Sequence, residues 1–166
     1  LLLAQIVSAQ TGTLDASFLG SSNSEVTVIK QQPDGKILVG GSFSSFNGNT
    51  ISGIVRLNTD GSIDNTFNTG IGISTGSIVE DIALQPDGKI IIAGQFNLYN
   101  GHSSMHIARL NADGTFDNTF TSYFTNTNDR VRTIALMPDG RIMVGGSLTD
   151  YNSTTIKNIL RINADG

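Results

Sequence analysis

The sequence of 166 residues contains no cysteine and only two histidines, so it can form neither a disulfide framework nor a thiolate metal site. Charged residues make up only 14% of the chain. The ten lysines and arginines are scattered and the net charge is -4, which argues against nucleic acid binding because phosphate contacts need clustered basic side chains. Glutamate occurs only at positions 25 and 80, and strong helix formers are scarce beside nineteen glycines. An all-β, turn-rich chain is expected.

Long apolar runs are also lacking, so no membrane span is expected. The first ten residues are apolar and end in Val7-Ser8-Ala9-Gln10, which resembles the end of a secretory signal peptide with its small-residue cleavage site. The competing interpretation is an ordinary first strand. The signal-peptide interpretation predicts a secreted or cell-surface protein.

One stretch occurs three times, as Gln32–Gly41, Gln85–Gly94 and Met137–Gly146. Its prolines stand at 33, 86 and 138, so the period is 53 and then 52 residues, which is typical of a repeat architecture. The expected divisions are a signal-peptide remnant at 1–10, a partial repeat (final strand of a blade) with a linker at 11–25, repeat 1 at 26–67, a linker at 68–78, repeat 2 at 79–120, a linker at 121–130 and a truncated repeat 3 at 131–166.

Each repeat predicts four strands. The first, Val26–Gln31 and its equivalents, leads through Pro-Asp-Gly, a turn sequence, into a second strand such as 36–41. This second strand is apolar on both faces, and the pairs Gly40-Gly41, Ala93-Gly94 and Gly145-Gly146 that end it suit close approach of another backbone. A third strand ends in Arg-[Leu/Ile]-Asn, and an Asp-Gly turn leads to a short fourth strand with the pattern Asp-x-x-Phe.

These two motifs together resemble the delta-60 repeat family over nearly the whole chain after residue 11. The first is [Gln/Met]-Pro-Asp-Gly-[Lys/Arg]-Ile, and the second is Arg-[Leu/Ile]-Asn-x-Asp-Gly followed by Asp-x-[Ser/Thr]-Phe. The resemblance implies β-propeller blades in large secreted or surface bacterial proteins, and it supplies no catalytic residue or ligand. The expected fold is therefore all-β, with three four-stranded antiparallel blades of propeller type in an open arc or partial propeller. Closed propellers usually need about four to eight blades.

Several candidate sites also admit ordinary structural roles. Around Gly61 the alternating Asn58, Asp60, Ser62 and Asp64 suggest a calcium loop, but an EF-hand register places Arg56 and Phe67 at ligand positions, so no metal site is expected. The Asp side chains are instead expected to accept hydrogen bonds from local backbone donors. His102 and His106 are expected to be solvated loop residues. Lys36, Lys89 and Arg141 are expected to be solvated residues at the exits of the Pro-Asp-Gly turns.

The repeated arginines Arg56, Arg109 and Arg161 are expected to form structural ion pairs, with Asp64 or Asp117 as partners. The functional alternative is a ring of arginines that faces a central channel.

The sequence predicts a non-catalytic extracellular propeller module, structural or binding, with a protein or glycan partner. No catalytic, cofactor-binding or metal-binding residue is predicted, and no cofactor. Self-association is one way to close a ring. The alternative is part of a propeller hydrolase or lyase whose active site needs the complete ring. Non-repeated polar residues gathered on one rim would favour an enzyme, and the candidates are Tyr123, Asp129, Arg130, Asp150, His102 and His106.

Overall fold

The computed structural model describes residues 12, 15, 18 and 20–166, and these residues form fifteen β-strands and no helix. The expected signal-peptide remnant at 1–10 lies outside the described residues. None of the described residues belongs to a helix with the length and apolarity of a membrane span. The chain is all-β, as expected.

The strands fall into three units of five. Unit 1 contains β1 (Val26–Gln31), β2 (Ile37–Gly41), β3 (Ser45–Phe46), β4 (Asn49–Thr50) and β5 (Ile54–Leu57). Unit 2 contains β6 (Ile78–Leu84), β7 (Ile90–Gln95), β8 (Leu98–Tyr99), β9 (His102–Ser103) and β10 (Ile107–Leu110). Unit 3 contains β11 (Arg130–Leu136), β12 (Ile142–Ser147), β13 (Asp150–Tyr151), β14 (Thr154–Thr155) and β15 (Ile159–Ile162).

Every unit has the same antiparallel topology. Its first, second and fifth strands form a three-stranded sheet in the orders β1-β2-β5, β6-β7-β10 and β11-β12-β15, and the two short strands form a separate hairpin. The expected fourth strand of the blade pairs through a single bridge in units 1 and 2, Leu57 with Ile63 and Leu110 with Phe116. Each unit is therefore a propeller-type blade whose outermost strand is very short.

The Pro-Asp-Gly sequence forms the hairpin turn between the first two strands of each sheet. In unit 2, Gly88 N donates to Gln85 O at 3.0 Å, and Gly88 has a φ of +86°, which glycine tolerates best. The Asp87 carboxylate accepts from Lys89 N at 3.1 Å, and equivalent bonds occur in the other two units. Local sequence therefore determines where each sheet turns.

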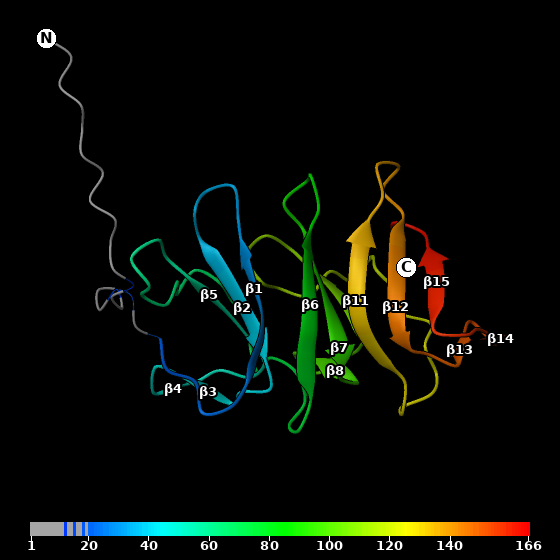
Figure 1. Ribbon diagram of the computed structural model, residues 1–166, viewed down its shortest axis with the longest axis horizontal. Helices are drawn as coiled ribbons and strands as arrows, with labels where there is room; N and C mark the ends of the chain where they lie inside the picture. The colour runs from blue at the N-terminus through cyan, green and yellow to red at the C-terminus, as the bar shows by residue number, and fades with distance from the viewer. Residues whose placement is uncertain (1–11, 13–14, 16–17, 19) are drawn as a thin grey trace, which may run out of the picture.

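The units lie side by side in an open arc, with β1, β6 and β11 as neighbours along one wall (Figure 1). The Pro-Asp-Gly turns lie along the upper edge, and the short hairpins and the linkers lie along the lower edge, called the rim below (Figure 1). No strand of the described residues joins the sheet of unit 1 to the sheet of unit 3.

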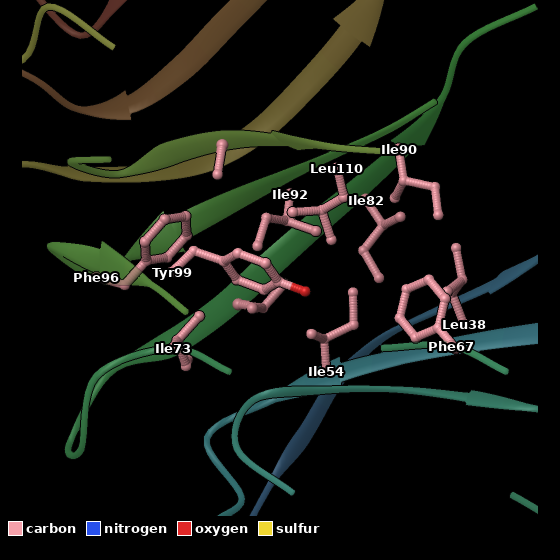
Figure 2. Close-up of a cluster of buried hydrophobic side chains, with 12 residues drawn as sticks. Leu38, Ile54, Phe67, Ile73, Ile82, Ile90, Ile92, Phe96, Tyr99 and Leu110 are labelled. Carbon is pink, nitrogen blue, oxygen red and sulfur yellow. The ribbon is translucent and has the colours of Figure 1, made fainter. Parts of the chain in front are cut away.

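The cores lie between units because the second strand of each sheet is apolar on both faces. In β7, Ile90 and Ile92 face the core shared with unit 1, whereas Ile91 and Ala93 face the core shared with unit 3. All four are fully buried. Figure 2 shows Leu38, Ile54 and Phe67 of unit 1 packed with Ile82, Ile90 and Tyr99 of unit 2. Each such side chain contributes roughly 1.5–3 kcal/mol on burial, so neighbouring units stabilise one another.

Candidate functional site

The largest clusters of charged side chains in the described residues are two repeated ones. Each contains an arginine, an aspartate and a lysine and is called the inter-unit clasp. In unit 1, Arg56 Nε donates to Asp64 Oδ2 at 2.7 Å, and Lys36 Nζ donates to the same oxygen at 2.8 Å. The other carboxylate oxygen accepts from Thr66 N at 3.0 Å and Thr66 Oγ1 at 2.6 Å. Both oxygens of the carboxylate are therefore occupied by protein donors.

Unit 2 repeats this clasp with Arg109, Asp117 and Lys89. The arginine and lysine donate to Asp117 Oδ2 at 2.7 and 2.8 Å, and Thr119 N and Oγ1 donate to Oδ1 at 2.9 and 2.7 Å. The expected arginine–aspartate pairs are confirmed. The expected solvation of Lys36 and Lys89 is wrong, because the hairpin twist carries each lysine side chain back over its sheet to the aspartate, 28 residues away in sequence.

The clasp also connects each unit to the next. Arg56 Nη1 donates to Ala112 O at 2.6 Å, and Arg109 Nη1 donates to Ala164 O at 2.5 Å. The guanidinium of Arg56 lies 4.6 Å from the ring centroid of Phe67, an arrangement that adds a cation–π attraction. Because the arginine contacts two units and a buried ring, the clasp is structural.

Burial would raise the pKa of Asp64 and Asp117, but the hydrogen bonds from the lysine, threonine and arginine of each clasp outweigh it and hold both pKa values well below the usual range. Both carboxylates therefore stay ionised at neutral pH and cannot act as general acids.

The aspartates of the Asp-Gly turns also act locally. Asp60 Oδ1 accepts from Ser62 Oγ at 2.6 Å and from Ser62 N at 3.0 Å, and the first of these bonds is the main reason why the pKa of Asp60 is lowered. Asp113 makes the same two bonds to Thr115. In the part of the chain that the structure describes, no three histidine or acidic side chains gather as a metal-binding group.

The linker at 121–130 brings most of the non-repeated candidates to the rim of unit 3. Asp129 is buried and accepts from Thr149 N and Thr149 Oγ1, both at 2.8 Å. Asp150 Oδ2 accepts from Thr125 Oγ1 at 2.5 Å. The ring of Tyr123, which is exposed, lies 5.9 Å from that of Tyr151 in an edge arrangement. The two carboxylates thus fasten the linker to the hairpin.

The other candidates lie elsewhere. Arg130 forms an ion pair with Glu80 between neighbouring inner strands. His102 is exposed on β9 and stacks on Phe116 at 4.6 Å, but the expectation that His106 is solvated is wrong. His106 is fully buried, and its Nε2 donates to Asn126 O at 2.9 Å, because the linker folds over it. Sequence spacing could not show this cover, since Asn126 is 20 residues away.

A neutral recess of about 420 Å³ lies on the rim between the linkers of units 2 and 3. This rim recess presents hydroxyl and amide side chains beside an exposed Leu98. The hydroxyls of Ser74 and Ser77 lie 2.8 Å apart. The lining residues are Ser74, Thr75, Gly76, Ser77, Gln95, Phe96, Asn97, Leu98 and Thr127. Sequence reasoning missed this site, because serine, threonine and asparagine are common in every loop of the chain.

Three segments of the chain, residues 32–67, 85–120 and 138–166, match a family described as a domain of unknown function (DUF5122) beta-propeller. Together the segments span more than half of the sequence, and each begins at or one residue before a Pro-Asp-Gly turn. No curated protein sequence and no solved structure matches the chain.

Proposed function

The chain belongs to the DUF5122 β-propeller family, and we propose that it is a non-catalytic, exported binding module whose rim recess holds a neutral glycan. Export to the cell surface, and the narrower assignment to the delta-60 repeats, belong to the same proposal. They rest on the signal-like residues 1–10 and on the two repeated motifs.

The observation that carries the proposal is the chemistry of the rim recess. Its lining contains four hydroxyl side chains, Ser74, Thr75, Ser77 and Thr127, and two amides, Gln95 and Asn97, with no charged residue. Hydroxyls and amides donate and accept hydrogen bonds, as sugar hydroxyls do, and an exposed apolar side chain such as Leu98 suits the apolar face of a sugar ring. A charged ligand would find no counter-ion in this lining.

The non-catalytic part of the proposal is supported by how the acidic residues are used. Asp64 and Asp117 are held ionised in the clasps, and Asp129 accepts hydrogen bonds from its own hairpin. A glycoside hydrolase needs two carboxyl groups, one of them a proton donor, on either side of one bond. No acidic residue lines the rim recess.

Affinity electrophoresis tests this proposal, with the chain run in native gels that contain dextran, xylan, galactomannan or mixed-linkage β-glucan. At least one polysaccharide should retard the chain, and the double variant Gln95→Ala/Asn97→Ala should lose most of that retardation. Both side chains are exposed, so the variant should fold normally. Asn118→Ala, at an exposed position outside the recess, is the matched control.

Equal retardation of the recess variant and the control would contradict the glycan site. Release of reducing sugar from a retarding polysaccharide would contradict the non-catalytic assignment. Retardation by no polysaccharide would favour a protein partner instead.

A further inference from the structure

A second site is the groove beside β15, which has a volume of about 600 Å³ and is lined by β15 residues Leu160, Arg161 and Ile162 together with Tyr151 and Ile156. It is called the β15 groove. Its place in the fold is the outer edge of the third sheet, at the end of the arc (Figure 1).

In units 1 and 2 the same edge is covered by the Asp-x-x-Phe segment. Asp64 N donates to Arg56 O at 2.9 Å, and Asp117 N donates to Arg109 O at 2.9 Å, so each segment runs along the last strand of its sheet. Each segment also supplies the aspartate of the clasp and a buried phenylalanine, Phe67 or Phe120.

The β15 groove has the receptor side of this arrangement. Arg161 occupies the position of Arg56 and Arg109, is exposed, and forms no ion pair with any carboxylate of the described residues. The neighbouring Ile159 is 63% exposed. The Tyr151 hydroxyl is buried and finds no partner in the part of the chain that the structure describes, whereas the equivalent Tyr99 hydroxyl donates to Gly114 O at 2.6 Å.

A segment that matches this groove is present near the other end of the arc. Residues 12–18 read Gly-Thr-Leu-Asp-Ala-Ser-Phe, and their glycine, aspartate and phenylalanine recur at the same spacing in residues 61–67 and 114–120. Phe18 already lies at unit 1 as Phe67 lies at unit 2. A Cβ on Gly61 would meet the Phe18 ring at 3.0 Å, and a Cβ on Gly114 would meet the Phe67 ring at 3.0 Å.

We propose that the β15 groove binds residues 12–18 of a second copy of this chain. Asp15 of the second copy then pairs with Arg161, and Phe18 of the second copy lies between unit 3 of one molecule and unit 1 of the other. This junction repeats the contact that joins units 1 and 2 within one chain. Two reciprocal junctions bring six units into one ring, within the range of about four to eight blades that closed propellers contain. The proposal does not depend on the glycan site.

Size-exclusion chromatography with light scattering on the full chain tests the proposal. The expected mass is twice the 17.6 kDa of one chain. Asp15→Arg and Arg161→Glu each place like charges at both junctions, and each variant should weaken dimerisation at least tenfold. Both positions are exposed, so the variants should keep the wild-type circular dichroism spectrum. Arg132→Glu, the same charge change at an exposed position of β11, is the control and should stay dimeric.

Mixing the two single variants gives the sharpest result. A mixed dimer has one wild-type junction, and in its other junction the two charges are exchanged, so that opposite charges face each other at both. The mixture should therefore dimerise although neither variant does alone. A monomeric wild-type chain overturns the proposal. So does a dimer that neither single variant weakens, or a pair of monomeric variants that the mixture does not restore.

Discussion

Gly94 offers the most direct test of the packing, because the structure leaves no room for a side chain there. A Cβ on Gly94 would lie 2.0 Å from the backbone oxygen of Ile78 and 3.1 Å from the backbone nitrogen of Glu80, whereas real Cβ atoms essentially never approach within 3.0 Å. The Gly94→Ala substitution must therefore push β6 and β7 apart by about 1 Å, at the point where a bulge shifts their register.

The energetic consequence follows from this displacement. Overpacking that moves backbone costs typically about 1–3 kcal/mol, and the upper end applies because both colliding atoms belong to strands. Loss of one or two ladder hydrogen bonds adds about 1 kcal/mol each. The lower entropy of the unfolded alanine chain returns only about 0.4–1 kcal/mol. The expected net loss is about 3 kcal/mol, which for a chain of this size lowers Tm by about 6–12 °C.

Urea denaturation followed by circular dichroism measures this loss, with Gly145→Ala as the matched control. Gly145 lies one residue before the equivalent tight glycine of unit 3, and a Cβ there would meet only the Thr133 Cγ2 methyl at 3.2 Å. Unit 2 itself carries Ala93 at this position, so the control should lose less than about 1 kcal/mol. If Gly94→Ala were no less stable than Gly145→Ala, the backbone contact inferred at the bulge would be wrong.

Two further predictions concern buried polar groups. The native pKa values of Asp64 and Asp117 lie below their unfolded values, so the native state binds fewer protons. Their stabilisation should therefore be complete above about pH 5 and be lost as the pH falls through about 4. Asp117→Asn should cost about 3–5 kcal/mol at pH 7 and flatten this pH dependence, and urea midpoints from pH 3 to 7 would show an unchanged slope if the reasoning were wrong. Tyr99→Phe should cost about 1–3 kcal/mol because the buried Gly114 carbonyl loses its donor, whereas Tyr151→Phe should cost almost nothing. Equal losses in thermal melts of the two variants would contradict that difference.

Much of the fold could be predicted because its determinants are local and occur three times. The Pro-Asp-Gly sequence places a turn through the backbone preferences of its own residues, and the strand pattern predicts β1 at Val26–Gln31, where the structure has it. The tight glycine was predictable from the small pair that ends an apolar strand. The apolar run in β7 predicted cover on both faces, and the structure supplies it from units 1 and 3.

The candidate site could not be predicted in the same way. Residues 74–77 and Thr127 are ordinary polar loop residues until two linkers meet on one rim. The burial of His106 likewise depends on a linker that folds over it, which no spacing within the hairpin encodes.

By itself, the sequence determined the repeat, its turns, its strands and its all-β class, since each follows from the conformational preferences of a few consecutive residues. Only the tertiary structure decided which charges meet. Lys36 reaches Asp64, and Arg56 reaches Ala112 in the next unit, 56 residues along the chain. The physical reason is that such contacts depend on the twist of each sheet and on the stacking of one unit against the next. Both are properties of the packed arc that no single segment of the chain carries.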